Sequence, residues 1–195
     1  YITLNLHNGS RTIVHHRDLP EFSFTDFQTI KLNDFDWIHI EGRNVIEIAK
    51  MLIKIRQTCP NIPISLEVEK SRPNIENLFP QVDFLLFSKI FAQCHINNAA
   101  SFLQNIRELS AANLVCAWGV DGGYALDTTG NILHSSAYPP SQIIDTLGAG
   151  DTFNAGIINS LCKQHDLATA LTSACKLAGK KCGQFGFKGL GMYTN

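Results

Sequence analysis

A run of small residues beside a carboxylate could bind a phosphate and accept a proton. Residues 145–153 read Asp-Thr-Leu-Gly-Ala-Gly-Asp-Thr-Phe, and Gly148, Ala149 and Gly150 leave the main chain open to an approaching anion. Their N–H groups, with the positive end of a helix that would begin here, favour bound negative charge. Asp151 follows directly, so a base would stand where the phosphate arrives. This arrangement predicts phosphoryl transfer with Asp151 as the catalytic residue.

The residues after Asp151 have the spacing of a helix that is packed on one face. Intervals of three and four residues separate Phe153, Gly156, Ile157, Ser160 and Leu161. A helix over residues 150–162 would fix the anion site in position. An aspartate at a helix start is commonly only a cap or a partner of the helix dipole, worth about 1 kcal/mol. For a lone Gly-x-Gly-Asp both interpretations stay open.

The complete stretch 145–153 resembles the signature of the ribokinase-like (PfkB) family of sugar and nucleoside kinases. Four other segments resemble the ketohexokinase branch of that family, in the same order: residues 37–44, 66–70, 115–119 and 178–183. The resemblance implies transfer of the ATP γ-phosphate to the C1 hydroxyl of D-fructose, with Asp151 as the base in contact with the sugar. It implies Mg²⁺ as cofactor, and a monovalent cation such as K⁺ beside the loop that starts at Asp145.

The resemblance also assigns residues to the nucleotide. It places ATP against a loop, an arginine, the residues before Asp151 and the last helix: Gly119, Val120, Asp121, Gly122, Arg11, Gly148, Ala149, Gly150, Gly179 and Cys182. A guanidinium such as that of Arg11 suits phosphate oxygens. Without the resemblance, Gly122 indicates a hairpin turn, Arg11 an exposed strand edge, and Gly179 and Cys182 helix packing.

The metal ligands stay open. Residues 88–91 read Ser-Lys-Ile-Phe, where many members of the family have Asn-x-x-Glu to organise magnesium. Three lysines of the last helix, Lys176, Lys180 and Lys181, are expected to form a solvated face.

Apolar runs and periodicity predict an α/β fold. Strands are expected at residues 37–40, 64–68, 82–87, 114–118, 124–127 and 132–135, and helices at 44–57, 74–79, 98–109, 150–162 and 167–182. Strands that alternate with such helices favour a mostly parallel sheet with helices on both faces, which is the three-layer ribokinase-like sandwich that the resemblance implies. Ligands of such sheets bind outside the carboxyl ends of the strands.

Composition agrees with one domain and excludes several partners. The chain has 195 residues, 45% of them hydrophobic and 17% charged, and a formal net charge of -1. That balance gives no reason to expect nucleic acid or an anionic membrane as partner. The six cysteines form no Cys-x-x-Cys pair and are expected to be reduced and mostly buried. Neither a signal-like start nor an apolar run of about 20 residues is present, so a cytoplasmic protein is expected.

The chain starts at Tyr1 and is expected to be the carboxyl-terminal part of a kinase domain, over residues 1–195. By the resemblance, residues 10–17 belong to a lid that forms a homodimer contact, and the sugar contacts precede this chain. Two alternatives remain. One is another sugar or nucleoside kinase, and the other is a non-catalytic fragment that binds nucleotide.

Overall fold

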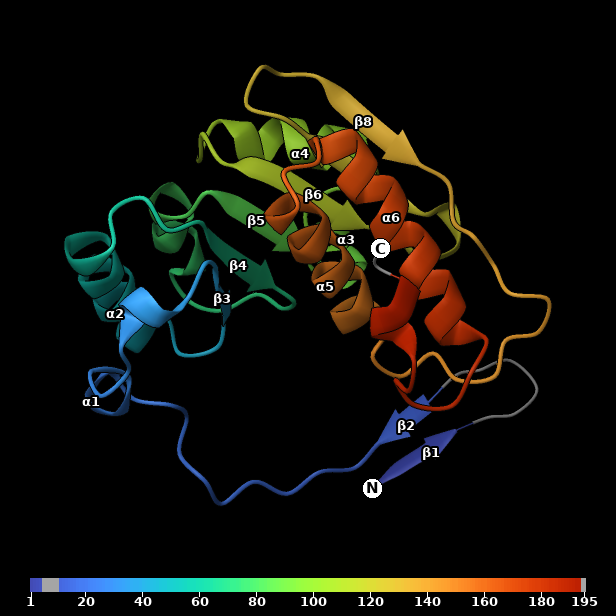
Figure 1. Ribbon diagram of the computed structural model, residues 1–195, viewed down its shortest axis with the longest axis horizontal. Coiled ribbons are helices and arrows are strands. Elements are labelled where there is room, and N and C mark those ends of the chain that lie inside the picture. The colour runs from blue at the N-terminus through green and yellow to red at the C-terminus, as the bar shows by residue number, and fades with distance from the viewer. Residues whose placement is uncertain (5–10, 194–195) are drawn as a thin grey trace. The chain divides into compact units, whose positions relative to one another are not determined.

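The computed structural model describes residues 1–4 and 11–193, and within them two compact units. Unit 1 comprises Tyr1–Asp18, Ala117–Tyr124 and Leu133–Asn195, and unit 2 comprises Leu19–Cys116 and Ala125–Ile132. Each unit is described separately, and Figure 1 shows their elements.

A parallel sheet organises unit 2. Its strands are β3 (Ile38–Glu41), β4 (Ile64–Val68), β5 (Phe84–Phe87) and β6 (Asn113–Ala117). Neighbouring strands pair in parallel, with Leu66 opposite Ile40 on one side and Leu85 on the other. The larger sheet has the order β3-β4-β5-β6-β7-β8, in which β7 is Gly123–Leu126 and β8 is Ile132–Ser135. Strand β5 is continuously apolar, as expected for a strand that is covered on both faces. Strand β4 is buried at four of its five positions, although it includes Ser65 and Glu67.

Two short helical segments precede β3 in unit 2, and the other helices follow its strands. The helices are α1 (Phe24–Phe27), α2 (Val45–Thr58), α3 (Lys89–Gln93) and α4 (Ala99–Arg107), with 3-10 segments η1 (Leu32–Asp34) and η2 (Ile75–Gln81). The Asn44 side chain caps α2, which buries Leu52 and Ile55 completely. Four aromatic rings fill the core near α3 and α4, with centroids 5.1 to 6.0 Å apart: Phe79, Phe87, Phe91 and Phe102.

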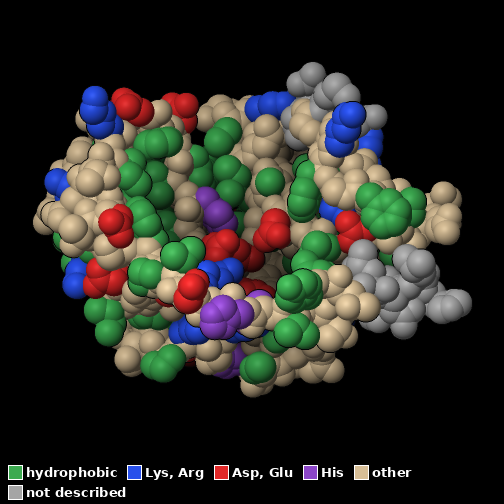
Figure 2. All heavy atoms as spheres, turned by 90° about the horizontal axis from the view of Figure 1, so that it is seen from below, with side chains coloured by type: hydrophobic (Ala, Val, Ile, Leu, Met, Phe, Trp, Pro, Cys, Tyr) green, Lys and Arg blue, Asp and Glu red, His purple; other side chains and the backbone are tan. Residues whose placement is uncertain are grey.

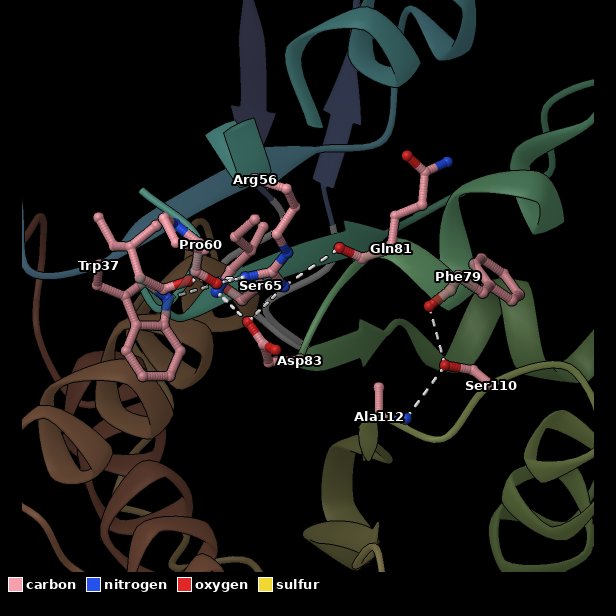
Figure 3. Close-up of polar contacts among 11 residues, drawn as sticks. Trp37, Arg56, Pro60, Ser65, Phe79, Gln81, Asp83, Ser110 and Ala112 are labelled. Atoms are coloured by element: carbon pink, nitrogen blue, oxygen red, sulfur yellow. Dashed lines mark hydrogen bonds and ion pairs between the residues drawn. The ribbon is translucent and has the colours of Figure 1, made fainter. Parts of the chain in front are cut away.

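Polar side chains fix the connections of unit 2, as Figure 3 shows. Asp83 Oδ2 accepts hydrogen bonds from Arg56 Nη2 at 2.8 Å and from the Ile64 amide at 2.7 Å, which joins α2 to the starts of β4 and β5. The buried Ser110 hydroxyl donates to the Phe79 carbonyl at 2.9 Å and accepts from the Ala112 amide at 3.2 Å. The loop that leads into β6 is therefore tied to η2.

Two long helices organise unit 1. Helices α5 (Ala149–Cys162) and α6 (Leu167–Cys182) lie side by side in Figure 1. A Cβ at Gly156 would lie 2.8 Å from the Ala174 Cα, so glycine allows the close approach of the two helices. The unit also contains an antiparallel pair of strands, β1 (Ile2–Leu4) and β2 (Arg11–Ile13), and the 3-10 segments η3 (Gly119–Asp121) and η4 (Leu190–Tyr193).

The long elements confirm the sequence-based predictions to within about two residues at most ends, and α6 matches at both ends. The region expected as a helix at 74–79 is instead the 3-10 segment η2, which contains Pro80. The helices α1 and α3 were not predicted, because four or five residues are too few to show a helical period.

The surface and the cysteines complete the description. Figure 2 shows positive and negative side chains interspersed on one face, in keeping with the small net charge. All six cysteines are free thiols, but the expectation that most are buried is wrong: Cys116 and Cys175 are buried, whereas Cys94 and Cys162 are exposed. Burial raises the pKa of the Cys116 thiol to about 12. Among the described residues, every helix is too short or too polar to span a lipid bilayer.

Ser110→Ala should lower the free energy of unfolding by about 1–3 kcal/mol, because the Phe79 carbonyl and the Ala112 amide would lose their buried partner. Urea denaturation measures the change. Ser101→Ala, at an exposed position on α4, is the control and should be within about 0.5 kcal/mol of the unchanged protein. Equal effects of the two substitutions would contradict the role of the Ser110 bonds.

Candidate phosphate-binding site

The start of α5 leaves several main-chain donors available. Gly148 is the N-cap residue in a left-handed conformation with φ of 74°, and no side chain caps the helix. The Ala149 amide donates to the Thr146 carbonyl at 3.2 Å. Within the described part of the chain, no acceptor faces the amides of Gly148, Gly150 and Asp151. Unpaired amides at the positive end of a 14-residue helix form a site for an anion.

Asp151 lies in the first turn of α5 and is exposed. A Cβ placed on Gly148 would lie 3.5 Å from Asp151 Oδ2, so the carboxylate reaches back over the N-cap residue. The Asp151 carboxylate and the unpaired amides therefore share one end of one helix, as the sequence predicted from their spacing.

The two glycines of this motif have different surroundings. A Cβ at Gly148 would collide with the Phe187 ring, and the positive φ disfavours any other residue there. Apart from its chain neighbours and the nearby backbone of α5, no described atom lies within 4 Å of a Cβ placed on Gly150, so the space beside this residue is open. Gly148 has a structural reason to be glycine, whereas no described residue gives such a reason for Gly150.

The loop predicted to contact ATP is a 3-10 turn between β6 and β7. Gly119 and Gly122 both have positive φ, and a Cβ at Gly122 would collide with the Ser135 carbonyl. The turn itself therefore requires Gly122. Val120 is 86% exposed at its tip. A Cβ on Gly123, which follows Gly122, would lie 3.0 Å from the Phe153 ring. This close contact packs the end of the loop against the first turns of α5.

A buried ion pair holds the loop before α5. Lys181 is completely buried and Asp145 is 5% exposed, and Lys181 Nζ lies 2.7 Å from Asp145 Oδ2. Asp145 also accepts from the Leu147 amide at 2.8 Å through Oδ1 and from the Gly186 amide at 3.4 Å through Oδ2. The hydrogen bond from Lys181 holds the pKa of Asp145 below its ordinary value, against the opposing effect of burial.

The expectation that the three lysines of α6 form a solvated face is therefore wrong for Lys181. The periodicity of the sequence could not predict that Lys181 is buried, because a lysine on an amphipathic helix is ordinarily exposed. Only its pairing in space with Asp145, 36 residues earlier, explains its burial.

Cys182 and Gly179 lie where α6 meets the chain before α5. The Cys182 carbonyl accepts from the amides of Ile144 and Asp145 at 2.8 and 3.2 Å, and burial raises the pKa of its thiol. A Cβ at Gly179 would collide with the Tyr138 carbonyl, so packing alone accounts for this glycine. Arg11 pairs with Leu4 in the β1–β2 ladder, and its side chain is outside the described part of the structure.

All the predicted site residues belong to unit 1. No group of three or more His, Cys, Asp or Glu suited to a metal occurs among the described residues. In unit 2, Ser88 Oγ donates to the Glu69 carbonyl and caps α3, and Phe91 is buried. Ser88 and Phe91 of the segment 88–91 thus have structural contacts, whereas Ile90 is exposed.

A hollow of about 420 Å³ lies in unit 2 beside α1, α2 and β3. Its lining is mostly apolar and includes Phe27, Trp37 and Met51. It contains none of the predicted site residues.

Comparison with known proteins shows which family this chain resembles. The sequence profile of pfkB family carbohydrate kinases matches residues 3–189. Ketohexokinase of Mus musculus is 43% identical over 198 aligned residues, which cover 96% of this chain and 66% of the mouse protein. This chain thus spans about two-thirds of that relative's length.

Solved structures show the same fold. The ribokinase of Arabidopsis thaliana complexed with ribose and ATP matches with a TM-score of 0.70 at 16% identity, over 100% of this chain and 68% of that one. The adenosine kinase of Sinorhizobium meliloti matches with a TM-score of 0.72 at 15% identity, over 85% of this chain and 54% of that one. The prediction of a ribokinase-like α/β fold is confirmed.

Gly148→Ala should destabilise the folded chain by about 1–2 kcal/mol, because alanine is strained in the left-handed region. Gly150→Ala, in the open helical position two residues later, should leave the stability unchanged or raise it by up to about 1 kcal/mol. Thermal melts of both variants measure this difference. A Gly148 variant as stable as the Gly150 variant would show that the N-cap geometry is not needed.

Proposed function

We propose that this chain, which belongs to the pfkB family of carbohydrate kinases, carries the phosphoryl-transfer site of an ATP-dependent kinase that phosphorylates D-fructose at its C1 hydroxyl. The observation that carries the proposal is the group of unpaired amides at the start of α5 with Asp151 beside them. The 43% identity to mouse ketohexokinase supports fructose as the substrate.

In the proposed reaction, the C1 hydroxyl oxygen of fructose attacks the γ-phosphorus while Asp151 accepts the hydroxyl proton. The bond between the γ-phosphorus and the β-phosphate oxygen of ATP breaks at the same time. The products are fructose 1-phosphate and ADP. The amides of Gly148, Gly150 and Asp151 would stabilise the negative charge on the transferred group. Ala149 contributes less, since its amide already donates to Thr146.

Magnesium fits this site only as a partner of the nucleotide. No carboxylate cluster of the described residues offers it a cage, and Mg²⁺ commonly binds through substrate phosphates and water. When bound, it would neutralise charge on the β- and γ-phosphate oxygens.

The nucleotide contacts are part of the proposal. Gly119 and Val120 are suited to lie along ATP, since Gly119 has open space beside it and Val120 is exposed. Roles for Asp121, Arg11 and the Cys182 thiol rest on the resemblance to the family. A homodimer through the strands near residues 10–17 is proposed on the same basis.

Asp151→Asn should lower turnover by roughly 10²- to 10⁴-fold, because the amide side chain cannot accept the proton. The measurement is ADP release with Mg²⁺, K⁺, ATP and D-fructose. Asp166→Asn is the matched control: Asp166 also begins a helix, and asparagine caps equally well, so turnover should not change.

Turnover that survives in Asp151→Asn would overturn the assignment of the base. If the unchanged chain binds ATP but releases no ADP with any of fructose, ribose or adenosine, the result favours a non-catalytic nucleotide-binding role. Release with ribose or adenosine but not with fructose would support a different kinase.

Gly150→Ala should weaken binding of a non-hydrolysable ATP analogue, while the protein remains at least as stable as before. The added methyl group would occupy open space beside the free amides, where the phosphate would approach. Isothermal titration calorimetry measures the affinity, and a thermal melt of the same sample shows that folding is intact. Unchanged affinity would place the phosphate elsewhere.

A further inference from the structure

The ammonium group of Lys181 occupies a small cage of oxygen atoms. Its Nζ lies 2.7 Å from Asp145 Oδ2, 2.9 Å from the Asp145 carbonyl oxygen and 3.5 Å from the Gln184 carbonyl oxygen. Lysine has three N–H donors and no acceptor, so these three oxygens account for all of its hydrogens. The Phe187 ring lies on another side, with its centroid 5.4 Å away.

The cage joins two segments that are far apart in the sequence. Asp145 begins the loop that leads to Gly148 and α5, whereas Gln184 follows α6. The Gly186 amide donates to the same Asp145 carboxylate, so the segment after α6 closes around the pair. Lys181 therefore links the loop before the free amides to the end of the neighbouring helix.

The resemblance to ribokinase-like kinases implies a monovalent cation beside the loop that starts at Asp145. Such an ion is held by carbonyl and carboxylate oxygens that replace its water. Here an ammonium group, which has the same charge and similar ligands, is already bonded to the oxygens of Asp145. A second cation would meet Lys181 at close range in a buried place, where repulsion between like charges is strong. These residues do not fit a bound K⁺.

We propose that the Lys181 ammonium takes the place of the monovalent cation, so that the loop before α5 is ordered by the chain's own side chain and does not depend on K⁺. This replaces the expectation of potassium activation. The inference concerns the folding of the loop, and it holds whichever substrate the site accepts. Lys181 is on this view a positioning residue, which acts through Asp145.

The first test compares the melting temperature of the unchanged protein in KCl, NaCl and choline chloride at one ionic strength. A cation that binds only the folded form at about ten times its dissociation constant would raise the melting temperature by roughly 3–6 °C. We expect no saturable difference between the salts. A saturable rise in KCl would overturn the proposal, and this readout does not depend on catalysis or on ATP.

The second test removes the ammonium. Lys181→Ala should lower the melting temperature in choline chloride by roughly 10 °C, because Asp145 would remain buried without its partner. The space left should admit K⁺, so the variant's melting temperature should rise with KCl in a saturable way. Lys176→Ala, at an exposed position on the same helix, should show neither effect.

A Lys181 variant as stable as the Lys176 variant would contradict the proposal, and so would a Lys181 variant that responds to KCl no more than the unchanged protein. If Lys181→Ala does not fold, the melting temperatures of the unchanged protein in the three salts still test the proposal.

Discussion

The buried pair of Asp145 and Lys181 is the interaction on which the candidate site depends. Two charges out of water are costly unless each is fully bonded, and both are here. The carboxylate receives two main-chain amides besides the ammonium. The pair therefore fixes the course of the chain on both sides of it, into α5 and out of α6. Replacing either partner alone would leave a buried charge, so neither can change without the other.

This pair explains how the helix start can keep its amides free. A helix N-terminus is usually satisfied by a cap, and α5 has no side-chain cap. Its preceding loop must then be held by other bonds, which Asp145 and the Cys182 carbonyl supply. The donors of Gly148, Gly150 and Asp151 are left for a ligand. The Asp145 side chain that holds the loop is thus three to six residues before the amides and the carboxylate that would do the chemistry.

The sequence predicted the elements whose apolar residues form a continuous run or recur at regular spacing. Strands β4 and β8 and helix α6 were found because apolar runs or regular spacing extend over them. The motif at residues 145–153 predicted the anion site, because its glycines and carboxylate are adjacent. What depends on pairing across the chain was missed: Lys181 was assigned to solvent, and the Ser110 bonds were not foreseen. Gly122 must be glycine because a Cβ there would collide with the Ser135 carbonyl, and this contact likewise could not be read from the sequence.

Two independent observations support the proposed function, and each concerns a different half of the reaction. The free amides and Asp151 favour transfer of a phosphoryl group, but they do not select the acceptor. Proteins of the same fold are named for ribose and for adenosine, so the fold does not select it either. The ketose is supported by the 43% identity to mouse ketohexokinase, which extends over 96% of the chain. Evidence against fructose would therefore leave the phosphoryl-transfer site intact, whereas loss of the Asp151 role would remove the chemistry for every acceptor.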